Sequence, residues 1–146
     1  MIFNSENRGF SLLELVMAIA IFSMGAIAAG YLMIDASTTS NMALEKSYAS
    51  SIAREGLEAI SSMRDGGFTS LTPGTYGLAT TSNSWIFSGS SDISYAKYTR
   101  VVTISSPPGS GTQQYVTVTS NVSWLNARGV TDNVSLTTVL TNWHNN

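Results

Sequence analysis

Apolar residues are concentrated in one uninterrupted run near the start of the chain. Residues 10–34 read FSLLELVMAIAIFSMGAIAAGYLMI, and Glu14 is the only charged residue among these 25. At about 1.5 Å per residue such a helix is roughly 37 Å long, enough to cross a hydrocarbon core of about 30 Å. The pattern therefore predicts a membrane-spanning helix. A cleaved secretory signal fits poorly, because the apolar core is too long and the preceding segment is short and barely basic.

The following segment has the pattern of an amphipathic helix. Residues 35–65 contain no Pro and a single Gly. A period of 3.6 residues separates a charged face from an apolar face. The charged face carries Arg54, Glu55 and Glu58, and the apolar face carries Ile52, Ala53, Leu57, Ala59, Ile60 and Met63. Because Gly66 and Gly67 form a stop signal, we expect one helix from about Phe10 to about Arg64, roughly 80 Å long.

Beyond Gly67 the periodicity changes to that of strands. Residues 68–96 are rich in Gly, Ser and Thr and predict a loop between helix and sheet. Alternation then predicts strands at Tyr98–Ser105, Gln114–Leu125 and Val130–Trp143, joined by short turns. On the middle strand Val116, Val118, Val122 and Trp124 share one face. We expect an α+β fold, in which a small antiparallel sheet of three or four strands packs on the second half of the helix.

Composition narrows the possible functions. Only 11% of residues are charged, against roughly 25% in an average soluble domain, and the net charge is −2. This balance gives no basic surface for nucleic acid. The chain has no Cys, and its one His, His144, lies two residues from the end. The sequence shows no convergent nucleophile, base and orienting group, so we expect no enzyme, no cofactor and no metal site.

Glu14 is the unusual residue of the apolar run. An ionised acid near the middle of a membrane costs about 2.5–3.5 kcal/mol on insertion scales, so an acid inside a span is a candidate functional group. Alternatively, Glu14 lies at the membrane interface and complements the positive end of the helix dipole. The residues by themselves leave both interpretations open.

The segment around Glu14 resembles the type III signal of the type IV pilin family; it reads Arg8-Gly9-Phe10-Ser11-Leu12-Leu13-Glu14-Leu15. In that family a basic residue and Gly precede the cut, Phe begins the mature chain, and Glu is its fifth residue. The resemblance implies that prepilin peptidase recognises Arg8 and Gly9 and cleaves between Gly9 and Phe10. It also implies that the Phe10 amine is methylated and that Glu14 acts in assembly. Ser11 stands where Thr is more usual.

The resemblance also implies an organisation and a set of partners. Residues 1–9 would be the leader, 10–34 the transmembrane and polymerisation half of the helix, 35–65 its amphipathic half, and 66–146 a globular head that includes the 68–96 loop. The implied partners are other pilin or pseudopilin subunits, prepilin peptidase and an inner-membrane assembly platform. The implied location is the inner membrane, crossed once with the head outside the cytoplasm, and then a pilus or pseudopilus.

Two further segments are similar to minor pilins of the V type and to I-type pseudopilins: AREGLEAISSMRDGGF at the helix end and VSLTTVLTNW near the C-terminus. The favoured function is therefore a non-enzymatic structural subunit, a minor pilin or pseudopilin, of a type IV pilus or type II secretion pseudopilus. The alternatives are a major filament subunit and an uncleaved, signal-anchored module whose head binds a ligand.

Overall fold

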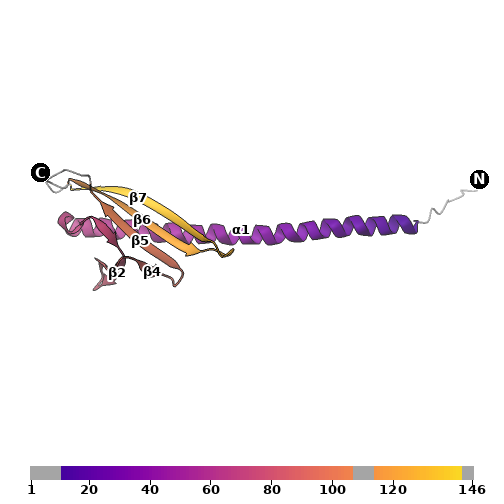
Figure 1. Cartoon of the computed structure of the whole chain (residues 1–146), viewed down its shortest axis with the longest axis horizontal. Coiled ribbons are helices and arrows are strands. Elements are labelled where there is room, and N and C mark those ends of the chain that lie inside the picture. Colours follow the sequence, from indigo (N-terminus) through magenta and orange to yellow (C-terminus); the bar gives the residue numbers. More distant parts are fainter. Residues whose placement is uncertain (1–10, 107–113, 143–146) are drawn as a thin grey trace, which may run out of the picture. The chain divides into compact units, whose positions relative to one another are not determined.

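The computed structural model describes residues 11–106 and 114–142. Helix α1 spans Leu12–Gly66, close to the predicted limits, and is followed by a short 3-10 helix at Phe68–Ser70. The chain divides into two compact units at Ser40–Asn41, each of which is described by itself. The second unit contains the later turns of α1 and all seven strands (Figure 1).

The predicted antiparallel meander is present. Its three strands are β5 at Tyr98–Ser105, β6 at Tyr115–Leu125 and β7 at Thr131–Thr141. β6 pairs with both neighbours, with Val102 opposite Ser120 and Val118 opposite Thr138. The inward positions of β6 are buried as the alternation predicts, because successive side chains of a strand point to opposite faces. The predicted α+β class is confirmed.

The prediction of a loop over residues 68–96 is wrong. This segment forms four short strands: β1 at Gly74–Tyr76, β2 at Leu78–Thr81, β3 at Ser84–Phe87 and β4 at Asp92–Ser94. β1 and β4 both pair with β5, giving a sheet of five strands where three or four were predicted, and β2 and β3 form a separate hairpin. Strands of three or four residues are too short to show a clear period of two. β1 and β4 are held by pairing with β5, and β2 and β3 by pairing with each other.

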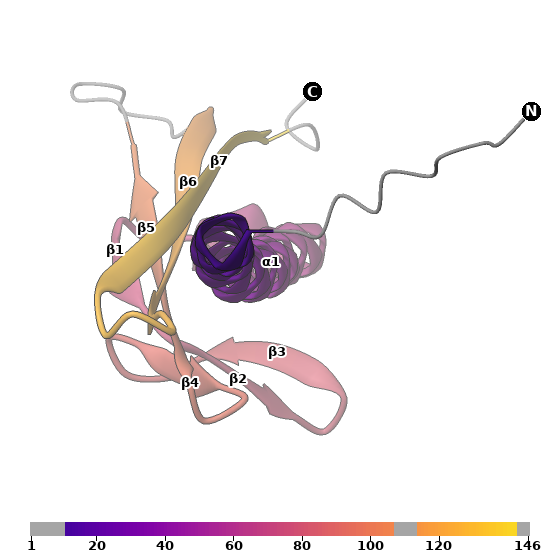
Figure 2. The same ribbon diagram turned by 90° about the vertical axis from the view of Figure 1, so that its right-hand side faces the viewer.

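The core of the second unit lies between α1 and the sheet. Figure 2 shows the helix in the angle between β1, β5, β6 and β7 on one side and the β2–β3 hairpin on another. The predicted apolar helix face is buried at Ile52, Ala53, Ala59 and Ile60, while Leu57 and Met63 are partly buried. Ala49 and Gly56 complete the buried face. Its small side chains allow the helix backbone to approach the strands closely.

The core consists of two apolar clusters with a polar layer between them. One cluster includes Ile52, Tyr98 and Trp124, and the other includes Ile60 and Val118. Along α1, β5 and β6 the positions between the clusters are Gly56, Arg100 and Ser120. A methyl group at Gly56 would lie 2.6 Å from Ser120 Oγ and 3.1 Å from Arg100 Cδ. Glycine is therefore required there for space.

Arg100 links four elements of this unit, although its side chain is only 3% exposed. Its Nε and Nη2 donate to the two Asp92 carboxylate oxygens on β4, at 3.2 and 2.9 Å. Its Nη1 donates to the Ile52 carbonyl of α1 at 3.3 Å. Asp92 also accepts from the Leu78 amide of β2 at 3.0 Å. The guanidinium lies 5.8 Å from the centre of the Trp85 ring on β3.

A second polar contact joins α1 to the sheet at Glu45. Its carboxylate accepts from the Lys97 ammonium and, at 3.2 Å, from the indole Nε1 of Trp124. The Lys97 contact lowers the pKa of Glu45 below its ordinary value of 4.5, partial burial opposes this, and the Trp124 bond lowers it further. The charged form of Glu45 therefore stabilises the fold.

The tight contact at Gly56 leads to a double-mutant prediction. Replacing Gly by Ala inside a helix is usually stabilising by roughly 1 kcal/mol. At Gly56 we expect the opposite, a loss of about 1–3 kcal/mol in the free energy of unfolding, because the methyl group overpacks the core. Adding Ser120→Ala should recover most of the loss, since it removes the nearest atom. The measurement is urea denaturation of the full chain in detergent, followed by tryptophan fluorescence.

The matched control is Gly66→Ala. A methyl group there meets nothing within 4 Å, so stability should be unchanged or slightly raised. Ser120→Ala alone should be neutral or stabilising, because the Ser120 hydroxyl is buried with no hydrogen-bond partner in the described part of the chain. A stabilising effect of Gly56→Ala would show that the polar layer is not tightly packed.

Glu45 leads to a pH-dependent prediction. Because its folded-state pKa is lowered, its contribution is present above the unfolded pKa near 4.5 and is lost as the pH falls through the lower folded value. Between pH 6 and pH 3 the unfolding free energy of the unmodified protein should therefore fall more steeply than that of Glu45→Gln. Other carboxylates titrate in both proteins and cancel in the difference. Parallel curves would contradict a stabilising charge at Glu45.

Candidate processing and assembly site

The N-terminal candidates lie at the edge of the described chain. Arg8, Gly9 and Phe10 lie outside the described residues, so the proposed cleavage site has no structural account here. Helix α1 begins at Leu12, and the Leu15 amide donates to the Ser11 carbonyl at 3.1 Å. The proposed cut lies two residues before the start of α1 in the sequence.

Glu14 lies in the first turn of α1 and is exposed. An acidic side chain in this position complements the positive end of the helix dipole. Within residues 11–106 and 114–142, no cation or hydrogen-bond donor pairs with the carboxylate. The structure thus places Glu14 at the start of the helix with an exposed side chain, and its role in assembly stays a prediction.

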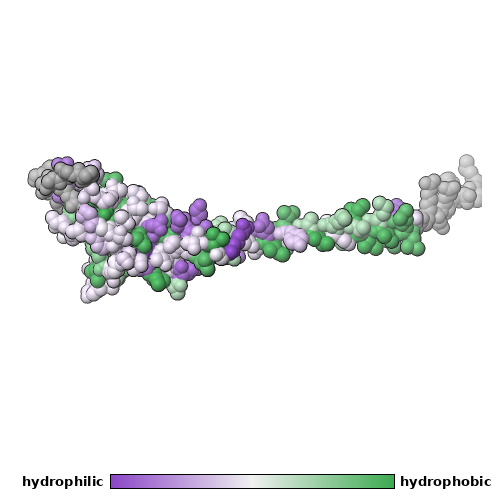
Figure 3. Space-filling view, viewed as in Figure 1, coloured by the Kyte–Doolittle hydropathy of each residue, from purple (hydrophilic) through white to green (hydrophobic). Residues whose placement is uncertain are grey.

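The apolar half of α1 has no cover within the chain. Every residue of 11–37 is exposed, and α1 is long and apolar enough to cross a membrane by length and composition. Exposed fractions of its large side chains run from 55% at Val16 to 79% at Leu12. Figure 3 shows hydrophobic residues gathered along this part of the helix. Such a surface needs lipid or other apolar helices around it.

Two hydroxyl side chains in this part of the helix are hydrogen-bonded to its own backbone. The Ser23 hydroxyl donates to the Ile19 carbonyl at 2.7 Å, and the Thr38 hydroxyl donates to the Ile34 carbonyl at 3.0 Å. Bonds to the carbonyl four residues earlier let hydroxyls enter an apolar medium without an unpaired donor. Glu14 is the one charged residue of residues 11–34.

Two glutamates of α1 and two tryptophans of the strands were placed by the structure within the second unit. Glu55 lies 3.8 Å from Arg100, and Glu58 of the same charged helix face is exposed. Trp124 is buried, and Trp85, expected in a loop, lies on β3 and packs partly buried against the core. Trp143 lies outside the described residues. The tryptophans described here therefore form no exposed platform.

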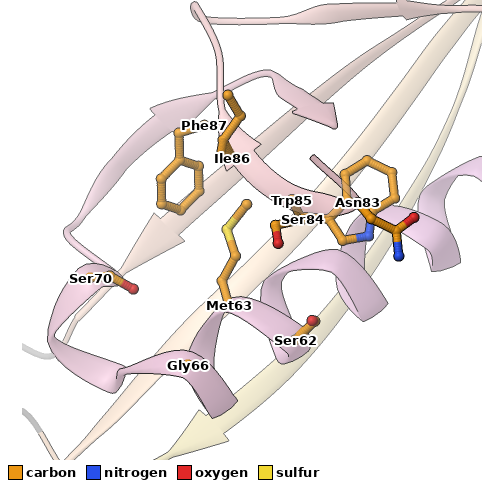
Figure 4. Close-up of a pocket in the computed structure, with 9 residues that line it drawn as sticks. All are labelled: Ser62, Met63, Gly66, Ser70, Asn83, Ser84, Trp85, Ile86 and Phe87. Atoms are coloured by element: carbon orange, nitrogen blue, oxygen red, sulfur yellow. The ribbon is translucent and has the colours of Figure 1, made fainter. Parts of the chain in front are cut away.

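A pocket of about 440 Å³ lies between the end of α1 and β3. In Figure 4 the Met63 side chain rises from the helix between Phe87 and Trp85. The other residues that line this pocket are Ser62, Gly66, Ser70, Asn83, Ser84 and Ile86. None of these groups titrates near neutral pH, so the pocket offers no general acid or base.

Sequence analysis missed the charged contacts of the head. Arg100 occupies an inward position of β5 beside Val102 and Ile104, where a charge requires a buried partner. That placement is visible in the alternation of YTRVVTIS and indicates a buried ion pair. The identity of the partner, Asp92, is not visible, because it depends on the pairing of β4 with β5.

Comparison with known families gives a match for residues 4–30 to the family described as the prokaryotic N-terminal methylation motif. This motif is the hallmark of type IV pilin-like, prepilin-type proteins. The comparisons with curated proteins and with solved structures give no match. The chain thus carries a prepilin-type N-terminus and has a pilin-like α+β fold. Together these features indicate a structural rather than a catalytic protein and fit a membrane-anchored pilin.

Proposed function

We propose that this protein is a minor pilin or pseudopilin that is assembled into a type IV pilus or a type II secretion pseudopilus. One observation carries the proposal. The methylation motif of residues 4–30 coincides with the start of a helix whose residues 11–37 are all exposed. A prepilin-type N-terminus on an uncovered apolar helix is what polymerisation through that helix requires.

Processing would convert a membrane anchor into an assembly element. Cleavage between Gly9 and Phe10, directed by Arg8 and Gly9, removes residues 1–9 and retains the apolar helix. The new Phe10 amine, which prepilin peptidase then methylates, carries a positive charge near neutral pH. Before assembly the helix spans the inner membrane once, with the head outside the cytoplasm.

Assembly would then be guided by Glu14. When helices bundle, the carboxylate of one subunit meets the Phe10 ammonium of another. Each charge alone would carry an uncompensated desolvation penalty, and pairing offsets both. This role is supported by the observation that the Glu14 carboxylate makes no ion pair or hydrogen bond with another described residue. The pair also fixes the axial register of the incoming subunit.

The exposed helix has features suited to bundling with other pilin or pseudopilin helices. Ala26 and Gly30 are small residues four positions apart, a spacing that allows close approach of helix backbones in membranes. A methyl group added at Gly30 would meet no other side chain within 4 Å, so this surface of the helix is open. In this proposal residues 10–34 form the polymerisation segment, residues 35–65 carry the head, and the inner-membrane assembly platform extracts the subunit.

Processing is tested by intact mass spectrometry of the membrane or filament fraction. We expect loss of Met1–Gly9 and addition of one methyl group at Phe10. A bulky residue at Gly9 should block the cut, whereas Ser11→Thr, which restores the more usual residue, should leave it intact. A protein that still begins at Met1 in cells with active prepilin peptidase would identify an uncleaved signal-anchored module instead.

The assembly role is tested with Glu14→Leu. This change should leave cleavage largely intact and membrane anchoring unchanged or firmer, because a charge unfavourable in lipid is removed. Incorporation into filaments should fall about tenfold or more, as expected for loss of a pair worth at least about 1.4 kcal/mol. The measurement is the ratio of the variant in sheared filaments to its abundance in the membrane.

The matched control for Glu14→Leu is Ser23→Leu, which replaces another polar group of the same segment. Because the Ser23 hydroxyl is bonded within its own helix, this variant should assemble normally. Normal incorporation of cleaved Glu14→Leu would refute the pairing mechanism. Equal loss in both variants would assign the effect to helix packing and not to charge.

A further inference from the structure

A second pocket, of about 420 Å³, lies within the second unit between α1 and the turn that joins β4 to β5. Three of its six lining residues are tyrosines. Its lining consists of Tyr48, Ser51, Ile52, Glu55, Tyr95 and Tyr98. The helix supplies the first four at a spacing that places them along one side, the β4–β5 turn supplies Tyr95, and β5 supplies Tyr98.

The aromatic rings are placed in ways that core packing does not require. Tyr98 is buried and forms the base of the pocket, at 7% exposure, but Tyr48 and Tyr95 are 64% and 82% exposed. Tyr95 and Ala96 have positive φ values of 54° and 56°. Such angles are uncommon for residues other than Gly. This turn thus presents a large aromatic side chain beside the helix at some conformational cost.

The pocket also carries an excess of negative charge. The Arg100 guanidinium behind it faces two carboxylates, and its two short bonds go to Asp92. Glu55 lies farther away, at 3.8 Å, and its side chain is 45% exposed. The guanidinium is therefore closer to Asp92 than to Glu55, and Glu55 is the one charged residue among those that line the pocket.

Neighbouring cations do not cancel this charge. Lys97, whose ammonium lies 6.0 Å from the Tyr98 ring centre, is bound by Glu45 and is not among the lining residues. Arg54 precedes Glu55 in the chain and lies on the exposed side of the helix, and it is not among the lining residues of this pocket.

We infer that this pocket binds an alkylammonium cation. Tyrosine faces attract cations through their negative quadrupole, and a nearby carboxylate adds a Coulombic term that an apolar ligand cannot use. Burial raises the pKa of Tyr98 above its usual 10.0, so its ring stays a neutral phenol near pH 7. The site is separate from the N-terminal motif and is independent of the assembly proposed above.

The test is ¹⁹F NMR of the full chain labelled with 3-fluorotyrosine, in an uncharged maltoside detergent. The probes are choline, butylammonium as a mimic of a lysine side chain, and 3,3-dimethylbutan-1-ol as the uncharged counterpart of choline. We expect the cations to shift the resonances of Tyr48, Tyr95 and Tyr98. The resonances of Tyr31, Tyr76 and Tyr115 serve as internal controls.

Two variants test which groups form the site. Glu55→Gln and Tyr48→Ala should each weaken cation binding about two- to fivefold, the range expected for one exposed cation–aromatic or charge contact. Both side chains are substantially exposed, so the fold should be retained. Glu58→Gln removes a carboxylate of the same helix outside the pocket and should leave binding unchanged.

Tighter binding of butylammonium than of choline would identify a lysine side chain of another polypeptide as the source of the cation. The reverse order would identify a quaternary ammonium compound. Equal shifts with the uncharged alcohol, or equal weakening by Glu58→Gln and Glu55→Gln, would overturn the inference. The inference would also be overturned if the cations shifted none of the three pocket tyrosine resonances, or shifted the three control tyrosines equally.

Discussion

The buried guanidinium of Arg100 is the interaction on which the head depends most. A charge with a 3% exposed side chain is tolerated only if its partners are all in place. Those partners come from β4, through Asp92, and from the helix, through the Ile52 carbonyl. Asp92 in turn holds the first amide of β2. Removing one partner of such a pair typically costs 3–5 kcal/mol, because the other charge stays buried. The contact therefore joins segments that have little regular structure of their own. Gly56 makes this possible, since any side chain there would occupy the space of Arg100 and Ser120.

The parts of the fold that the sequence predicts are those with long, uniform periodicity. Helix α1 and strands β5 to β7 each repeat their pattern over eight or more residues, and their limits differ from prediction by at most two residues. The four strands between Gly74 and Ser94 are shorter than the pattern needed to recognise them. The turn between β2 and β3 was also hard to predict from the sequence, because Ser82 and Asn83 adopt the positive φ values that are usually found at Gly. Among the candidate site residues, Glu14 could be identified from the sequence because it is the only charged residue in a long apolar run. The Tyr48–Tyr95 pocket was not, because it combines residues from the helix and from a turn that the sequence did not predict.

One helix serves two environments, and its sequence changes accordingly. In residues 11–37 large apolar side chains are distributed all around the helix and all are exposed. Between Ala49 and Ile60 the buried positions are mostly small, and polar residues occupy the outer face. The first pattern suits a surrounding that is apolar on every side, such as lipid or a bundle of similar helices. The second suits a single sheet packed on one face. The low charge of the head is compatible with this division, since the Ser- and Thr-rich strands present hydroxyls to water.

The two charges in apolar surroundings, Arg100 and Glu14, differ in where their partners lie. Arg100 is satisfied by the fold itself, so its charge stabilises a unique arrangement of strands and helix. Glu14 has no partner in the described chain, although it lies in a segment without another charge from residue 11 to residue 34. In water an exposed carboxylate at a helix N-terminus needs no explanation. In lipid or in a helix bundle the same carboxylate is unfavourable until a cation reaches it. In the proposed assembly the cation would come from a second molecule, whereas the cation of Arg100 is already paired within its own fold.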